Sequence, residues 1–224
     1  MSVPYYDADG ITLYLGDCRE ELAWLKADVL VTDPPYGISH SMWEQNVPAI
    51  IGEVRTGRSS TRVLTDEHVK VRNEALVAWK SRPALVFGHW RAPRPAATMM
   101  RLVWDRCLTG TGGVGAWAPS DEEIYLLYWP NPKDKGTSKG SILRSPTMRG
   151  DSRPDHPTPK PVALMEALIV DCPLGVIADP FAGSGSTLLA ARNQGRLAIG
   201  VEIEERYCEL IALRLAQADL FAAR

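Results

Sequence analysis

Two short segments of the chain combine residue types that can carry out chemistry. The first is Asp-Pro-Pro-Tyr at residues 33–36, where a carboxylate, two prolines and an aromatic ring directly follow the apolar run 28–32. The second is Asp-Pro-Phe-Ala-Gly-Ser-Gly-Ser-Thr at residues 179–187, which follows another apolar run. Because proline fixes the backbone angle φ, Pro34 and Pro35 hold the first carboxylate and the ring stiffly at a strand end.

The second segment is typical of a ligand-binding turn between a strand and a helix. The run 176–179 predicts a strand, Gly183 and Gly185 allow a turn, and a helical pattern then runs from Ser186 to just before Gly195. No lysine follows the second glycine, so the segment lacks the phosphate-binding lysine of a P-loop.

A second acid stands at the end of the next apolar run. Glu202 lies 23 positions after Asp179, where an acid can accept hydrogen bonds from ribose hydroxyls. The turn and the two acids therefore predict a site for an adenosine-like ligand. The alternative is that the glycines serve only close packing of the strand against the helix.

Residues 110–115, Gly-Thr-Gly-Gly-Val-Gly, match the dinucleotide-binding pattern G-x-G-x-x-G by letter. A phosphate-binding loop must lead from a strand into a helix, whereas this segment leads through a proline into another β-rich run. We therefore expect a hairpin or loop here.

The elements that position these segments form an alternating pattern, which predicts an α/β sheet in one domain over residues 1–224. Strands are expected at 11–16, 28–32, 84–88, 101–107, 123–129, 175–180 and 197–203. Residues 160–172 and 204–220 show the apolar spacing of amphipathic helices. Apolar periodicity fades over 39–74 and 131–159, which we interpret as long loops.

Composition limits the function. The formal net charge of −2 argues against binding polyanions by bulk charge. No stretch approaches a membrane span and no basic leader is seen, so we expect a soluble, cytoplasmic protein without membrane contact. The four cysteines have no zinc-like spacing and are expected to be reduced thiols.

The charge is unevenly distributed. Residues 1–54 hold two basic and nine acidic side chains, whereas 55–82 and 131–160 each hold seven basic and three acidic ones. The two basic segments are either solvated surface or phosphate contacts along a nucleic-acid backbone.

Together, the Asp-Pro-Pro-Tyr and Asp-Pro-Phe-Ala-Gly-Ser-Gly segments make the chain resemble the S-adenosylmethionine-dependent amino-methyltransferases of DNA. Residues 13–18 (Leu-Tyr-Leu-Gly-Asp-Cys) and 156–161 (His-Pro-Thr-Pro-Lys-Pro) add to this resemblance, and the catalytic segment precedes the cofactor segment, as in the permuted β subgroup. The resemblance covers about residues 11–40 and 84–210. It implies the Rossmann-like methyltransferase fold, with a single mostly parallel sheet.

The resemblance also implies roles for individual residues. The catalytic residues are Asp33, Pro34, Pro35 and Tyr36. The cofactor would lie against Asp17, Cys18, His156, Lys160, Asp179, Pro180, Phe181, Ala182, Gly183, Ser184, Gly185, Ser186, Thr187 and Glu202. Within this set, Asp17 is expected near the adenine of the cofactor, Glu202 on its ribose, and Lys160 with His156 near its carboxylate end.

The implied activity is site-specific methylation of adenine N6 in double-stranded DNA, on a base flipped out of the helix. Cytosine N4 is the alternative target, although family members with that target more often carry Ser in place of Asp33. Methylation of RNA or glutamine would favour Asn there. A non-catalytic subunit that binds cofactor or DNA is a further alternative. Target recognition is expected in residues 39–75 and 131–155, or shared across a homodimer.

Overall fold

The computed structural model describes residues 2–36, 69–107, 120–130, 139–147 and 159–222. Their elements are β1 (Tyr6–Ala8), β2 (Ile11–Leu15), η1 (Ala23–Lys26), β3 (Val29–Thr32), α2 (Val69–Trp79), β4 (Ala84–Gly88), β5 (Thr98–Asp105), β6 (Asp121–Leu127), β7 (Ile142–Arg144), α3 (Val162–Ile169), β8 (Ile177–Asp179), α4 (Ser186–Asn193), β9 (Ala198–Glu202) and α5 (Glu205–Ala222).

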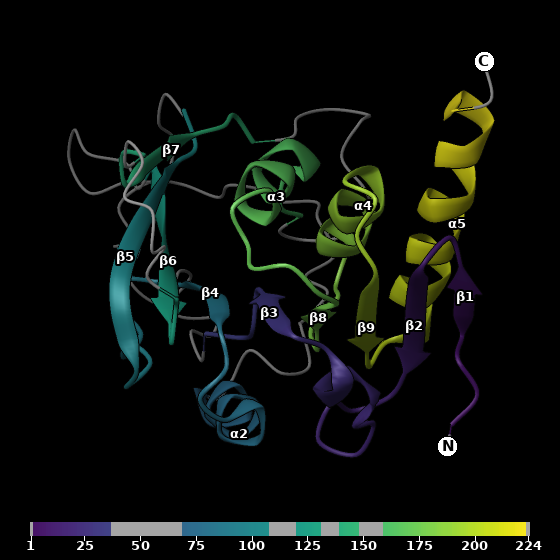
Figure 1. The fold of residues 1–224 in the computed structure, drawn as a ribbon, viewed down its shortest axis with the longest axis horizontal. Coiled ribbons are helices and arrows are strands. Elements are labelled where there is room, and N and C mark those ends of the chain that lie inside the picture. The colour runs from purple at the N-terminus through teal and green to yellow at the C-terminus, as the bar shows by residue number, and fades with distance from the viewer. Residues whose placement is uncertain (1, 37–68, 108–119, 131–138, 148–158, 223–224) are drawn as a thin grey trace, which may run out of the picture.

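The strands form one mixed, mostly parallel sheet, as predicted, in the order β1-β2-β9-β8-β3-β4-β6-β5-β7 (Figure 1). The five central strands, β2, β9, β8, β3 and β4, run parallel, and β6 pairs antiparallel with both β4 and β5. The chain leaves β8 toward β9 on one side and leaves β3 toward β4 on the other. The carboxyl ends of β8 and β3 therefore form the kind of crevice in which α/β proteins bind ligands.

Helices cover both faces of the sheet (Figure 1). Side chains of α3, α4 and α5 pack with Val29 and Val31 of β3 on one face. On the other face, Trp24 of η1 and Trp79 of α2 pack with Leu30 of β3. This alternation along β3 is the period of two expected of a strand that is buried on both sides. The predicted apolar faces of α3 and α5 are buried in the first of these layers.

Four elements differ from the sequence prediction. Helix α2 begins at Val69, inside the segment interpreted as a loop, and the short helix η1 and the short strands β1 and β7 were not expected. In α2 the buried positions include Arg72 beside Ala75 and Trp79, so a charged residue interrupts the apolar stripe that would have marked the helix. The glycines at 110–115 lie outside the described residues, between the antiparallel strands β5 and β6, so the expected hairpin or loop stays a prediction.

Two arginines of the basic segment 55–82 contact other parts of the protein. Arg72 is 2% exposed, and burial lowers the pKa of its guanidinium. Arg82 lies over the Trp79 ring at 3.5 Å and donates to the carbonyls of Leu25 and Ala27. Arg72 is therefore withdrawn from solvent, and the Arg82 guanidinium is engaged by main-chain carbonyls of the protein.

All four cysteines are free, and only Cys107 is exposed. Across the ranges that the structure describes, no helix combines the length and the apolar character needed to cross a membrane.

Candidate active site

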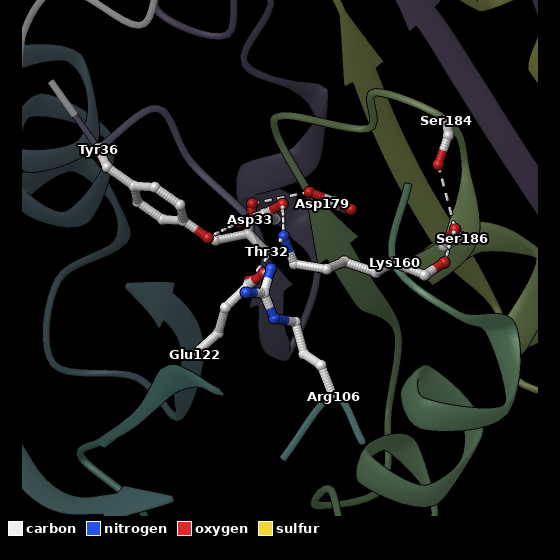
Figure 2. Close-up of polar contacts among 9 residues, drawn as sticks. All are labelled: Thr32, Asp33, Tyr36, Arg106, Glu122, Lys160, Asp179, Ser184 and Ser186. Carbon is white, nitrogen blue, oxygen red and sulfur yellow. Dashed lines mark hydrogen bonds and ion pairs between the residues drawn. The ribbon is translucent and has the colours of Figure 1, made fainter. Parts of the chain in front are cut away.

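The two chemically suggestive segments meet at the carboxyl ends of β3 and β8. These strands are parallel neighbours, with Leu30 opposite Ala178, so the residues that follow them emerge side by side. Thr32 Oγ1 donates a hydrogen bond of 2.7 Å to Asp179 Oδ1, and Asp33 is the next residue along the chain (Figure 2). The geometry therefore joins the Asp-Pro-Pro-Tyr segment directly to the glycine turn.

Both oxygens of Asp33 have partners. The Tyr36 hydroxyl donates to Oδ1, and Lys160 Nζ lies 2.5 Å from Oδ2 (Figure 2). Each oxygen of an ionised carboxylate has two acceptor positions, so one position on each remains for a substrate N–H. The Tyr36 ring lies beside His89, with ring centroids 6.2 Å apart.

Lys160 connects the two segments. Its carbonyl accepts a 2.6 Å hydrogen bond from Ser186 Oγ at the start of α4, while its ammonium group reaches Asp33 and lies 3.1 Å from Glu122 Oε2. Burial acts to lower the pKa of Lys160, but the charges of Asp33 and Glu122 outweigh it and raise that pKa above its usual value. Lys160 therefore stays charged, and its ammonium group points toward the Asp-Pro-Pro-Tyr segment.

The glycine turn is held by main-chain hydrogen bonds to buried acids. Phe181 N donates to Asp179 Oδ1 at 3.2 Å, and Gly183 N donates to Glu202 Oε2 at 2.7 Å. Gly183 and Gly185 have φ of 53° and 78°, in the left-handed region that favours glycine. The turn thus has the strand, turn and helix order that the sequence predicts.

Gly185 also has a packing role. A Cβ atom at this position would lie 2.7 Å from Ile211 Cγ1 of α5, closer than carbon atoms approach. Close packing, raised as the alternative explanation of the glycines, is therefore part of the reason for this one.

Burial raises the pKa of Asp179 to about 6 and that of Glu202 to about 7. Asp179 is 2% exposed and Glu202 is 7% exposed. Within the described ranges neither forms an ion pair, so the ionised forms gain no neutralising cation there. Two such acids beside a glycine turn suit a ligand that carries positive charge.

The remaining predicted cofactor residues occupy different surroundings. Asp17 binds the Arg19 guanidinium, and these hydrogen bonds lower the pKa of the Asp17 carboxyl. Cys18 is buried, and its carbonyl accepts a hydrogen bond from Trp24. Thr32, Pro34, Pro180 and Phe181 line one small pocket together with residues of β3, α2 and β4. Ala182, Ser184 and Thr187 are buried in and beside the turn. His156 lies outside the described residues.

Glu122 was not identified from the sequence. It stands at the start of β6 in the acidic run Asp121–Glu123, which gives no signal that one of the three faces the site. Only the pairing of β6 with β4, the neighbour of β3, brings its carboxylate to Lys160.

Comparison with known proteins agrees with this arrangement. A family model described as DNA methylase matches residues 57–213. The putative methylase YubD of Escherichia coli strain K12 is 48% identical over 219 residues, covering 90% of this chain and 88% of YubD. The DNA adenine methyltransferase YhdJ of the same strain is 35% identical over 98 residues, covering 42% of this chain and 33% of YhdJ.

Among solved structures, the M1.HpyAVI–SAM complex has the same fold. Its TM-score is 0.61 at 21% identity, over 91% of this chain and 99% of that chain. The family model and the extended identity with YubD agree with the geometry of the site, and we conclude that this chain belongs to the DNA methylase family of N6- and N4-methyltransferases.

Proposed function

We propose that the chain transfers the methyl group of S-adenosylmethionine to the exocyclic N6 of adenine in double-stranded DNA. The observation that carries the proposal is the connection of Asp33 to the glycine turn, through the Thr32–Asp179 hydrogen bond and through Lys160. An acid at position 33 favours adenine over cytosine N4, and the relative YhdJ is named as an adenine methyltransferase.

The donor set of the glycine turn fits S-adenosylmethionine. This cofactor is cationic at its sulfonium and ammonium groups, and Asp179 and Glu202 are buried acids that gain from a nearby positive charge. Both Glu202 oxygens already accept main-chain N–H groups, from Gly183 and Glu204, and their remaining lone pairs are available to ribose hydroxyls. The cofactor supplies an electrophilic methyl group and departs as a neutral thioether.

The protein's own contribution is to the nitrogen that receives the methyl group. The lone pair of an exocyclic amine is delocalised into the base, so the amine must turn toward tetrahedral geometry before it can react. Asp33 accepts one N–H through its carboxylate, and Pro34 accepts the other through its main-chain carbonyl, which favours that change. The Tyr36 ring stacks on the base. The proton lost after transfer passes to Asp33 or to solvent.

The target base must leave the duplex to reach this site, at a cost of a few kcal/mol that contacts to the DNA must offset. We propose that residues 39–75 and 131–155 supply these contacts and read the target sequence, either within one chain or across a homodimer acting on DNA in the cytoplasm. Both segments lie largely outside the described residues.

The test is to incubate DNA with the protein and S-adenosylmethionine, digest the DNA to nucleosides and identify the methylated base. We expect N6-methyladenine, and we expect Asp33→Ala to reduce its formation by about a hundredfold to a thousandfold, because one acceptor of the amine is lost. Asp171→Asn, which removes a surface partner of Lys139, is the matched control and should keep full activity.

N4-methylcytosine as the product would replace adenine by cytosine in the proposal. No methylated base, with cofactor binding retained, would make the chain a non-catalytic subunit. An active Asp33→Ala variant would overturn the assigned role of the carboxylate.

A further inference from the structure

A row of alternating charges leads away from Asp33. Lys160 Nζ lies 2.5 Å from Asp33 Oδ2 and 3.1 Å from Glu122 Oε2, and Arg106 Nη1 lies 3.4 Å from Glu122 Oε1. Figure 2 shows the four side chains converging from separate parts of the fold: the end of β3, the segment before α3, the start of β6 and the residue after β5. The row contains two anions and two cations, so its formal charge is zero.

The row is largely withdrawn from water. The exposed fractions of the side chains are 7% for Lys160, 15% for Glu122, 23% for Arg106 and 25% for Asp33. Removing charges from water is costly, and apolar side chains of similar size often stabilise a fold as well or better. Stability alone therefore does not explain why three more charges accompany the catalytic acid.

The electrostatic effect of the row on Asp33 explains the row better than stability does. If Lys160 had Asp33 as its only anionic partner, the ammonium charge would draw electron density from the carboxylate and weaken it as an acceptor for the substrate amine. Glu122 attracts the same ammonium group from another side, so the charge of Lys160 is divided between two carboxylates. Arg106 in turn supplies a cation to Glu122, which would otherwise leave an excess negative charge beside Asp33.

We propose that Glu122, acting through Lys160, is a positioning residue for Asp33. It holds the ammonium group in a fixed place, so that Asp33 keeps both its orientation and its strength as an acceptor. The Ser186 hydroxyl at the start of α4 donates a hydrogen bond to the main-chain carbonyl of the same lysine. The row of charges therefore fixes the position of the Asp33 carboxylate relative to the cofactor turn. This inference rests on the proposed methyl transfer.

The strand itself provides a matched control. Glu123 follows Glu122, and successive side chains of a strand point to opposite faces. The Glu123 carboxylate pairs with Arg101 and Arg94 and accepts a hydrogen bond from the Tyr125 hydroxyl. None of these three partners belongs to the row of charges. Glu123→Gln therefore removes a neighbouring buried carboxylate of the same strand without changing the partners of Lys160.

The experiment compares Glu122→Gln, Glu122→Asp and Glu123→Gln in the full-length protein. The measurements are single-turnover methyl transfer at saturating DNA and S-adenosylmethionine, the cofactor Kd by calorimetry, and base flipping by 2-aminopurine fluorescence. For Glu122→Gln we expect a rate roughly tenfold to a hundredfold lower, since misplacing a reacting group by about 1 Å costs up to about a hundredfold. Cofactor Kd and the fluorescence signal should change by less than about twofold.

Glu122→Asp should recover part of the lost rate, and Glu123→Gln should retain the wild-type rate. A normal rate for Glu122→Gln in an active preparation would overturn the proposal, as would a loss that appears only in cofactor Kd. If the wild-type protein transfers no methyl group, the proposed function fails first, and the two failures are thus distinguishable.

A double-mutant cycle keeps the test decisive if Glu122→Gln folds poorly. In a Lys160→Met background the lysine that transmits the effect is absent, so removing Glu122 as well can no longer displace an ammonium group beside Asp33, although Arg106 loses its contact with Glu122. We expect Glu122→Gln to cause no further loss of rate in that background, because residues that act through one another are not additive. Additive losses would show that Glu122 acts independently of Lys160 and would refute the proposal.

Discussion

At the scale of single residues, the site depends on acids whose surroundings differ. Asp33 shares charge with Lys160, whereas Asp179 and Glu202 have burial as the largest influence on their pKa. The sequence predicted all three acids from their positions at strand ends. The family resemblance implies that Lys160 lies near the carboxylate end of the cofactor, which stays a prediction, and the structure shows its ammonium group beside Asp33 and Glu122.

The raised pKa of Glu202 predicts how stability changes with pH. The folded protein keeps a proton on this group up to about pH 7, whereas the unfolded chain loses it near pH 4.5. The folded state therefore binds more protons between these values, and the group's contribution to stability falls as pH rises through this window. From pH 5 to pH 8 we expect a loss of roughly 2 kcal/mol in the free energy of unfolding from this group.

Urea unfolding of the free protein at pH 5 and pH 8 measures this contribution. Glu202→Gln should remove the part of the pH dependence that comes from this carboxyl group. A change in the free energy of unfolding that is the same at both pH values does not affect this comparison. Glu209→Gln, at an exposed position of α5, should leave the pH dependence as in the wild type. An unchanged pH dependence in Glu202→Gln would contradict the prediction.

At the scale of elements, the parallel strands and the helices that follow the cofactor turn were predictable, because their apolar patterns are regular. Helix α2 was not, because Arg72 occupies a buried position where the pattern calls for an apolar residue. Strand β7 has three residues, of which Ile142 is exposed, so no alternation marks it. Glu122 was not predicted for a related reason. Its position beside Lys160 depends on which strands pair in the sheet and not on the residues next to it in the sequence.

The glycine turn yields a prediction at this scale. Gly185 and Gly195 both have positive φ, but a Cβ atom would meet Ile211 at Gly185 and nothing within 4 Å at Gly195. Gly195→Ala should therefore cost about 1–2 kcal/mol from backbone strain alone. Gly185→Ala should cost about 1–3 kcal/mol more, because α5 must also shift away from the added methyl group.

Urea denaturation of the two variants measures the difference. In an Ile211→Ala background, which removes the Cγ1 and Cγ2 atoms from the contact, Gly185→Ala should cost less than it does in the wild type. Equal stabilities for the two glycine variants would show that α5 does not restrict position 185.

At the scale of the whole molecule, acidic and basic parts are separated along the chain. The acidic first 54 residues contrast with the basic segments 55–82 and 131–160. Since Arg72 is buried and Arg82 donates to main-chain carbonyls, we expect any phosphate contacts to come from other members of those segments. The sequence could not show which basic side chains are engaged by contacts within the protein, because that depends on burial in the folded state.

DNA binding should therefore weaken steeply as salt rises, with log K falling linearly against log salt concentration. Replacing Lys133 and Lys135 together by alanine should reduce the slope by about one to two, as expected when one or two phosphate contacts are lost. Lys26→Ala, at an exposed position in the acidic part, is the control and should leave the slope unchanged. A flat wild-type plot would exclude the basic segments as phosphate contacts.

The hydrogen bond between Thr32 and Asp179 joins residues 147 positions apart. A ribosome that has already released β3 must still synthesise more than half of the protein before Asp179, the hydrogen-bond partner of Thr32, exists. Until then Asp33 has no glycine turn beside it. Completion of the sheet is thus also the event that first brings the two segments together.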